Sequence, residues 1–313
     1  MDGLFDRFNV TEDQNIPNNL IEISSLIKVR TKTTKANLIK LANHEFNENS
    51  ETYKIISYAL MSENTYYRSF FVEILGKALN VPTGKRRFIG TLLEILHCSI
   101  NIINDFPEID NNYYRNNNLS CHLKYDKTQT IIASNLMNAW VFNLITGYKD
   151  VKLTKSERCD IANIISKNIG NTGNIGNQMM KVILKKKGYA YKDEITRIKK
   201  IHYLSLFSAG GQCIELLANT TKQQNDNIKI YINNLISLFE IYDNLTNCLN
   251  TDRLILENAK LIAEQSKTAI SSMSDNNVIY QNMYDFIDYN YYNIEKVYKS
   301  NMDQTSSKNL LTI

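Results

Sequence analysis

Proline, glycine and cysteine are scarce in this 313-residue chain, which contains 3 prolines, 11 glycines and 5 cysteines. With so few turn-forming residues and few stretches of alternating β-branched residues, an all-β fold is excluded. The cysteines are widely separated and form no C-x-x-C pair, so the sequence predicts neither a disulfide framework nor a zinc site. Apolar residues instead recur every three or four positions, which predicts an all-α protein.

Long apolar runs are also absent. None reaches the length of about 18 residues that a membrane-spanning helix requires, so no membrane span is expected. The first residues include Asp2, Asp6 and Glu12 without an apolar or basic stretch, which is unlike a secretion signal or a mitochondrial leader. We therefore expect a cytoplasmic protein.

The charge balance is mild, with 36 Lys and Arg against 32 Asp and Glu. Among the more obvious basic clusters are Lys185–Lys187 and Arg197–Lys200. We expect these clusters to be solvated helix faces, and the composition predicts no nucleic-acid partner.

The hydrophobic pattern divides the chain into a loose N-terminal arm at 1–18, one helical domain at 19–302 and a frayed tail at 303–313. Within the domain, helices are predicted near 20–30, 34–46, 50–61, 64–80, 86–105, 127–146, 155–169, 173–187, 192–220, 225–248, 253–273 and 277–300.

Two of these predicted helices carry polar stripes in which acids and amides occur without lysine. The first stripe consists of Glu94, His97, Asn101, Asn104 and Asp105. The second consists of Glu240, Asp243, Asn244 and Asn247. If the two helices face each other, they would line a polar cleft inside a bundle that could hold a metal. The alternative is that each stripe is the solvent-exposed face of an ordinary amphipathic helix.

From Glu94 the chain reads E-x-x-H, then N-D-F-P-E-I-D, then Y-R-N-N-N-L-S-C-H. This ordered string resembles the polyprenyl synthetases, the trans-prenyltransferase family that includes farnesyl and geranylgeranyl diphosphate synthases. Their pattern is E-x-x-H, D-D-x-x-x-x-D, R-R-G-x-P-T-x-H and A-I-L-A-G-D. The residues that fall on it without a gap are Glu94, His97, Asp105, Pro107, Asp110, Arg115, His122, Ile131 and Ala133.

The second stripe, with Phe239 before it, resembles the family's later motif F-Q-x-x-D-D-x-x-D. Upstream, the segment from His202 to Phe207 resembles K-T-G-x-L-F, and Asn177-Gln178 resembles a G-Q pair. The resemblance covers roughly residues 55–250. It implies the isoprenoid-synthase fold, an all-α helical bundle around a central cavity that is usually dimeric.

The resemblance also implies a reaction. An allylic diphosphate ionises, isopentenyl diphosphate attacks the carbocation, and a proton is lost. The two aspartate motifs hold three Mg²⁺ ions that neutralise the departing diphosphate, so Mg²⁺ is the expected cofactor if the chain is active.

At the metal positions that the resemblance implies, this chain keeps Asp105, Asp110 and Asp243. Amides stand at the other three, which are Asn104, Asn244 and Asn247. Half of the family's metal-binding carboxylates are thus replaced by neutral groups, which are weaker ligands for Mg²⁺.

The diphosphate contacts that the resemblance implies are similarly reduced. Arg68, His97 and Arg115 occupy family positions. Other residues replace the family's cations and their neighbours at five positions: Thr65, Tyr66, Asn116, His202 and Tyr203. The Gly- and Lys-rich lid of the family is also missing after Asn250, where the sequence turns directly into a helix.

The string VPTGKRRF, residues 81–88, looks like the family's first diphosphate grip, G-G-K-R-x-R-P. It lies about 20 residues before Asn104, however, whereas the family's interval is about 40, and that interval ends at residues 62–71. We therefore expect residues 84–87 to be a solvated basic turn.

Two further features concern the chain's interior. Ser99 and Ile100, just before the first motif, leave no aromatic floor to the chain pocket, so an active enzyme would make a longer product. Cys98 and Cys213 are expected to be small core residues rather than nucleophiles.

The joint loss at several sites favours a non-catalytic or weakly active structural or regulatory subunit in isoprenoid diphosphate biosynthesis. We expect a homodimer, or a heterodimer with an active prenyl diphosphate synthase. One alternative is an active Mg²⁺-dependent prenyltransferase, or an enzyme that ionises a single diphosphate. Another is a carrier or sensor that binds an isoprenoid or its diphosphate.

Overall fold

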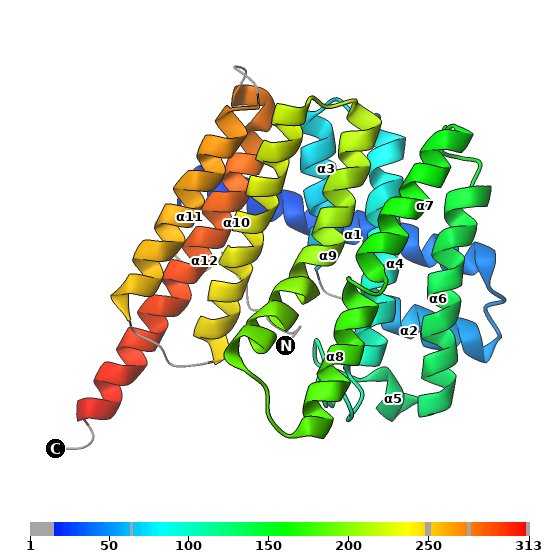
Figure 1. The fold of residues 1–313 in the computed structure, drawn as a ribbon, viewed down its shortest axis with the longest axis horizontal. Coiled ribbons are helices and arrows are strands. Elements are labelled where there is room, and N and C mark those ends of the chain that lie inside the picture. Colours follow the sequence, from blue (N-terminus) through cyan, green and yellow to red (C-terminus); the bar gives the residue numbers. More distant parts are fainter. Residues whose placement is uncertain (1–15, 63–64, 248–251, 274–276, 311–313) are drawn as a thin grey trace. The chain divides into compact units, whose positions relative to one another are not determined.

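The structure, a computed structural model, describes residues 16–62, 65–247, 252–273 and 277–310 (Figure 1). Its helices are α1 (Asn18–Glu45), α2 (Glu51–Ser62), α3 (Tyr67–Ala78), α4 (Thr83–Asn104), α5 (Cys121–Lys124), α6 (Lys127–Gly147), α7 (Lys155–Ile169), α8 (Asn174–Lys187), α9 (Lys192–Ala218), α10 (Lys222–Asn247), α11 (Arg253–Ser271) and α12 (Asn277–Leu310). Two short strands, β1 (Tyr114–Arg115) and β2 (Asn118–Leu119), form an antiparallel hairpin. The predicted all-α class is confirmed.

Local sequence signals explain where several helices begin and end. The Asp126 carboxylate accepts hydrogen bonds from the N–H groups of Thr128 and Gln129 at the start of α6. Thr154 and Glu157 form a capping box at the start of α7. Gly188 ends α8 in the left-handed conformation, with φ of 76°.

Some predicted boundaries were wrong. The predicted helices 20–30 and 34–46 are one continuous helix, α1, because the intervening segment has neither proline nor glycine to interrupt it. α4 begins at Thr83 rather than near residue 86, so residues 84–87 form its first turns and not a turn before it. α12 continues to Leu310, so the described part of the predicted C-terminal tail is helical. The predicted N-terminal arm falls almost wholly outside the described residues.

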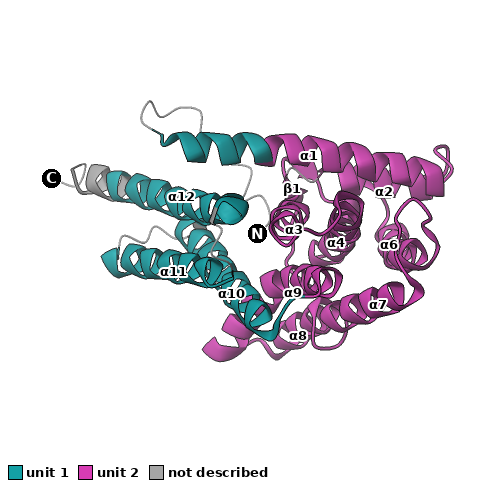
Figure 2. Cartoon of the chain, turned by 90° about the horizontal axis from the view of Figure 1, so that it is seen from above, with its two compact units in different colours: residues 1, 7–26, 220–313 teal, residues 2–6, 27–219 magenta. Residues whose placement is uncertain are grey.

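The chain forms two compact units (Figure 2). Unit 1 includes the described residues 16–26 and everything described after residue 219, and in it α10, α11 and α12 pack against one another. Unit 2 is residues 27–219. The single domain predicted for residues 19–302 stays a prediction.

Helix α4 is the central element of unit 2. It packs against α2, α3, α6, α8 and α9, and every residue from Phe88 to Ile102 is buried. A helix enclosed on all sides has no solvent-facing side, so its polar stripe lies inside the protein. For this helix, the alternative of an ordinary amphipathic surface helix is therefore wrong.

Two glycines allow α3, α4 and α9 to approach closely. A Cβ added to Gly90 on α4 would lie 2.8 Å from Ser69 Oγ and 3.0 Å from Ser69 Cα. One added to Gly210 on α9 would lie 2.8 Å from Val72 Cγ2 and 2.9 Å from Leu93 Cδ1. The spacing of the three helices thus depends on the absence of side chains at these positions.

A buried carboxylate joins three helices of unit 2. Glu73 on α3 accepts from Arg86 Nε of α4 at 3.0 Å and pairs with Arg30 Nη2 of α1 at 2.7 Å. Arg86 Nη1 also donates to the Val81 carbonyl at 2.7 Å. Lys85 pairs with Glu157 of α7 at 2.5 Å. Two of the three basic residues of VPTGKRRF are therefore structural cross-links.

We expect Gly90→Ala to lower the free energy of unfolding by about 1–3 kcal/mol, because the new methyl group meets the backbone of Ser69, which cannot rotate away. Gly84→Ala in the same helix is the matched control, since nothing lies within 4 Å of its added Cβ. It should be neutral or stabilise the protein by up to about 1 kcal/mol. Chemical denaturation measures both, and equal effects would contradict the close approach at Gly90.

Arg86→Ala should destabilise the protein by about 3 kcal/mol, because it leaves the buried Glu73 carboxylate short of a counterion. Arg87→Ala removes the same charge from an exposed neighbour and should change stability by less than about 0.5 kcal/mol. Thermal unfolding of the two variants side by side tests the assignment. A larger loss for Arg87→Ala would contradict it.

Candidate functional site

The first aspartate region lies where α4 ends and a tight loop begins. Asn104 is the last residue of α4, and Asp105 follows as its C-cap. The loop then returns through β1 and β2, whose two connecting residues, Asn116 and Asn117, have φ of 48° and 64°. Two left-handed residues in a row are what a two-residue hairpin turn requires, and asparagine tolerates that conformation. Asn116 therefore serves as a turn residue at the position where the family has an arginine.

Asp105 forms a bidentate ion pair with Arg115. Arg115 Nε donates to Asp105 Oδ2 at 2.9 Å, and Nη2 donates to Oδ1 at 2.7 Å. Asn112 Nδ2 also donates to Oδ1 at 3.0 Å. Both charged residues are buried, with exposed fractions of 2% and 7%. This paired geometry is the strong form of a carboxylate–guanidinium contact, and it joins the end of α4 to the β-hairpin.

The other two first-motif positions are tied to α8. Asp110 accepts from Lys181 Nζ at 3.0 and 2.9 Å, and Asn104 Oδ1 accepts from Gln178 Nε2 at 3.2 Å. Sequence reasoning missed Lys181. The signal was available, because Gln178, Lys181 and Lys185 are spaced three and four residues apart and therefore share one face of α8.

Glu94 and His97 face the start of α3 and the next turn of α4. Glu94 Oε1 accepts from the Ser69 N–H at 2.7 Å, so this carboxylate caps the N-terminal turn of α3. Its Oε2 lies 3.9 Å from His97 Nδ1, and Asn101 Nδ2 lies 3.0 Å from His97 Nε2. Glu94 thus has a clear structural role, while His97 belongs to a buried polar row.

The side chains at the positions expected to bind the first diphosphate are mostly buried inside unit 2. Tyr66 is buried and its hydroxyl donates to the Leu60 carbonyl at 2.8 Å, while Thr65 is half-buried. Arg68 is buried in the first turn of α3, with its guanidinium carbon 5.5 Å from the centre of the Phe207 ring. This distance is suitable for a cation–π contact.

The remaining predicted positions of unit 2 are also enclosed. His202 and Tyr203 are buried on α9 with their rings edge to face at 5.1 Å. The Ser99 hydroxyl lies within 3.1 Å of Ser134 and Asn138 on α6, and the Ile100 carbonyl accepts from Gln178. Ser99 is therefore a contact between α4 and α6, and the chain pocket expected at these two residues stays a prediction.

His122 and two cysteines have packing roles. The His122 ring meets Phe106 edge to face at 5.5 Å, and burial lowers the pKa of this histidine. Cys98 and Cys213 are buried within α4 and α9, as expected of small core residues.

The second aspartate region belongs to unit 1. Asp243 is buried on α10, and Thr246 Oγ1 donates to its backbone carbonyl at 2.9 Å. Asn244 is exposed, and the side chain of Asn247 lies outside the description. The predicted meeting of the two motifs across a cleft stays a prediction.

The first motif does not fit Mg²⁺ as the family would use it. Mg²⁺ prefers carboxylates with an excess of negative charge and near-octahedral geometry. Here Asp105 is paired with Arg115, Asp110 with Lys181, and Asn104 is neutral, so the four charged groups sum to zero. Within the described ranges, no three His, Cys, Asp or Glu side chains are grouped as a metal site would require.

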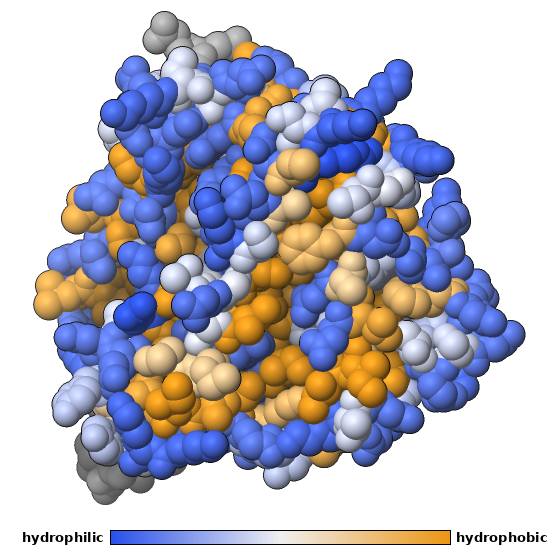
Figure 3. Space-filling view, turned by 45° about the vertical axis from the view of Figure 1, so that its right-hand side comes forward, coloured by the Kyte–Doolittle hydropathy of each residue, from blue (hydrophilic) through white to orange (hydrophobic). Residues whose placement is uncertain are grey.

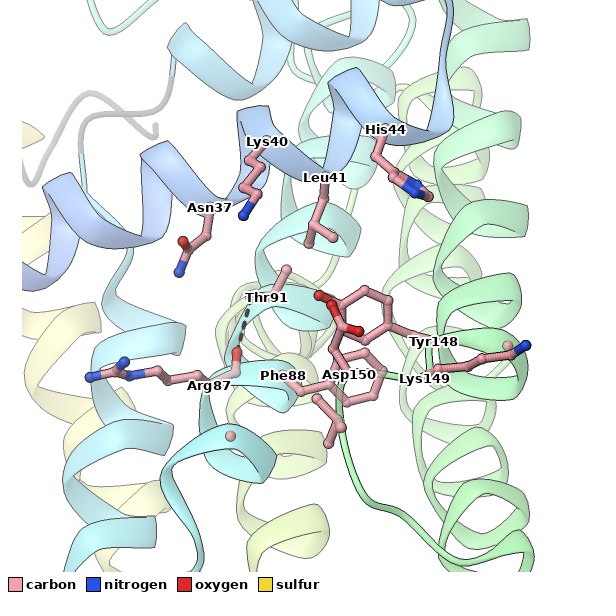
Figure 4. A pocket seen from close by; sticks show the side chains of 13 residues that line it. Asn37, Lys40, Leu41, His44, Arg87, Phe88, Thr91, Tyr148, Lys149 and Asp150 are labelled. Carbon is pink, nitrogen blue, oxygen red and sulfur yellow. Dashed lines mark hydrogen bonds between the residues drawn. The ribbon is translucent and has the colours of Figure 1, made fainter.

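A cavity of about 500 Å³ lies elsewhere in unit 2, between α1, the start of α4 and residues 147–151 (Figure 4). Phe88 and Tyr148 stack in it with ring centres 5.6 Å apart. Burial and the neighbouring Asp150 carboxylate raise the pKa of Tyr148. Arg87 lines this cavity, so the third basic residue of VPTGKRRF is neither an internal cross-link nor part of the first motif.

Comparison with known proteins supports the sequence resemblance. Farnesyl diphosphate synthase of Buchnera aphidicola subsp. Acyrthosiphon pisum (strain APS) is 24% identical over 158 residues, which cover 50% of this chain and 56% of that protein. Farnesyl diphosphate synthase of Micrococcus luteus is 24% identical over 196 residues, covering 63% and 66%. The chain thus spans about half the length of the Buchnera relatives that it matches.

Solved structures show the same fold. An FPP/GFPP synthase from Zymomonas mobilis superposes with a TM-score of 0.76 at 16% identity, covering 86% of this chain and 99% of that one. A geranyltransferase from Legionella pneumophila has a TM-score of 0.77 at 17% identity, covering 88% and 98%. At these identities the likeness shows the fold alone, which is the all-α isoprenoid-synthase fold.

A family model also matches the chain. The model for polyprenyl synthetases matches residues 49–277, well over half of the chain. The motif spacing, the fold and this match agree, and the chain belongs to the polyprenyl synthetase family.

Proposed function

We propose that this chain does not elongate prenyl chains by itself and acts as a structural or regulatory partner of an active prenyl diphosphate synthase. The observation that carries the proposal is the buried, bidentate Asp105–Arg115 pair at the first aspartate motif. In an active member of the family, a carboxylate at this position binds Mg²⁺. In this chain the carboxylate pairs with Arg115.

The energetics favour the pair over a metal. Recruiting Asp105 to Mg²⁺ would break its bidentate contact with the buried Arg115 guanidinium, and breaking a buried pair costs about 3–5 kcal/mol. Asp110 would have to leave Lys181 as well, a pair whose side chains are only 16% and 15% exposed. Departure of diphosphate requires concentrated positive charge beside the leaving group. We infer that the side chains of the first motif do not bind the Mg²⁺ that would supply this charge.

Helix α6 supports the proposal of a protein partner. No charged residue occurs from Thr128 to Tyr148, yet Ile131, Ile132 and Leu136 are 37%, 54% and 38% exposed. Figure 3 shows apolar side chains among the polar surface on the side of unit 2 that it brings forward. Exposed aliphatic side chains that gather on one helix often mark a face that a partner covers. We propose that a second prenyl synthetase chain, identical or homologous, covers this face.

An active Mg²⁺-dependent prenyltransferase is the second candidate. The observation in its favour is that the curated relatives with the printed name farnesyl diphosphate synthase match this chain. Its buried Arg68, His97 and Arg115 also lie at the family's diphosphate positions. The experiments below separate this candidate from the first, and Mg²⁺-independent binding of a farnesyl analogue would mark the carrier alternative.

The Asp105→Asn variant distinguishes an ion pair from a metal ligand by the sign of its effect. If Asp105 neutralises Arg115, the variant should lose about 3–5 kcal/mol of unfolding free energy without any metal present. Removing one of several clustered metal-binding carboxylates would instead relieve repulsion, and the metal-free protein would be unchanged or stabilised. Thermal and chemical unfolding in a metal chelator provide the measurement.

Glu108→Gln is the matched control, because it removes a carboxylate of the same loop that is 57% exposed. It should change stability by less than about 0.5 kcal/mol. Adding Mg²⁺ should leave the melting temperature of the unmodified protein where it was. A stabilised Asp105→Asn variant, or a clear rise with Mg²⁺, would contradict the ion-pair assignment.

An assay with an allylic diphosphate, isopentenyl diphosphate and Mg²⁺ tests the function itself. Alone, the chain should form no elongated product. Mixed with an active synthase from the same organism, it should change the rate or product length. The Ile132→Asp variant should abolish that change, since it places a charge on the exposed face of α6. Elongation by the purified chain alone would contradict the proposal.

A further inference from the structure

One segment concentrates the positive charge of the whole chain. Residues 179–200, which we name the hairpin tip, contain eight Lys and Arg residues and two acids, a net charge of +6. The whole chain has 36 basic and 32 acidic residues, so the remainder has 28 and 30 and a net charge of −2. The net positive charge of the protein therefore comes from the hairpin tip.

The tip is formed by the end of α8, a short loop and the start of α9. α8 ends at Lys187, Gly188 turns the chain in the left-handed conformation, and α9 begins at Lys192. Every residue from Lys185 to Asp193 is exposed except the half-buried Ala190. Figure 1 shows this connection as the loop that joins the lower ends of the two helices.

Two of the lysines attach the tip to the loop that follows α4. Lys181 pairs with Asp110, and Lys185 Nζ donates to the carbonyls of Pro107 and Ile109 at 2.5 and 3.4 Å. The position of the tip is thus fixed within unit 2. The exposed Lys186, Lys187 and Lys192 lie beyond these attachment points.

Large apolar side chains are exposed among these cations. Tyr189 and Tyr191 are 62% and 68% exposed, with their rings edge to face at 6.0 Å. Ile183 is 40% exposed and Ile195 is 45% exposed. A basic helix face that is merely solvated would not need to expose these apolar side chains. Their combination with the cations matches an anionic lipid surface, where apolar groups enter the headgroup region and cations meet lipid phosphates.

We propose that the hairpin tip docks the protein on the surface of an anionic lipid bilayer. Lys186, Lys187 and Lys192 provide the attraction, and the two tyrosines lie at the depth of the headgroups, which their amphipathic rings favour. The exposed aliphatic residues favour a bilayer over a nucleic acid, because they provide neither stacking nor hydrogen bonds to bases. Docking would bring the loop attached by Lys181 and Lys185 close to the membrane.

Co-sedimentation of the full chain with vesicles tests this proposal. We expect binding to vesicles of phosphatidylcholine mixed with phosphatidylserine, weaker binding as salt increases, and little binding to phosphatidylcholine alone. Lys186→Gln, Lys187→Gln and Lys192→Gln together should reduce partitioning about a hundredfold at low salt, since each basic residue near an anionic surface contributes about fivefold. Tyr189→Ser with Tyr191→Ser should weaken binding that persists at high salt.

The matched control removes three exposed lysines elsewhere in unit 2, by Lys152→Gln, Lys155→Gln and Lys167→Gln. It should change partitioning by less than about threefold, because the net charge changes equally but the docking surface is intact. Circular dichroism confirms that all variants fold. Equal losses in control and tip variants, equal binding to both kinds of vesicle, or displacement from vesicles by RNA at low concentration would overturn the proposal.

Discussion

The loop that carries the first motif depends on one buried ion pair. Asp105 caps the C-terminal end of the central helix of unit 2, and Arg115 is the last residue of the first hairpin strand. Their bidentate contact fixes the loop to α4, and the asparagine turn at residues 116–117 places the arginine. Replacing such a pair with apolar residues can be nearly neutral, but losing one partner is costly. The pair therefore constrains both residues together, and a metal that bound both carboxylate oxygens would compete with the guanidinium.

The same logic applies to the rest of the polar interior. Glu94 caps α3, Asp110 holds Lys181, and Glu73 holds Arg86 and Arg30. Each carboxylate has an internal N–H or cation as its partner, as buried charges require. Residues at family motif positions therefore also have packing roles in this chain. This accounts for the strong match in motif spacing in a chain whose first motif does not fit its metal.

Much of this could be predicted from the sequence, because helical periodicity and motif spacing are local patterns. They located the helices and the positions of Glu94, His97 and Asp105. The pairing of Asp110 with Lys181 could not be predicted in the same way, because the two residues are separated by 71 positions and meet only through the packing of α4 and α8. The structural role of Arg86 was missed for a similar reason, since its partner Glu73 lies on another helix. Charge patterning likewise revealed the basic clusters at residues 185–200 but not the exposed tyrosines between them.

The central claim is that the carboxylates of the first motif bind cations of the chain and not Mg²⁺. Isothermal titration calorimetry with a non-hydrolysable allylic diphosphate, in Mg²⁺ and in chelator, tests it most directly. We predict that any diphosphate affinity is the same within about threefold under the two conditions, since the cations that remain are side chains. Affinity that rises by about a hundredfold or more with Mg²⁺ would contradict the account, because such coupling requires metal ions bridging diphosphate and carboxylates.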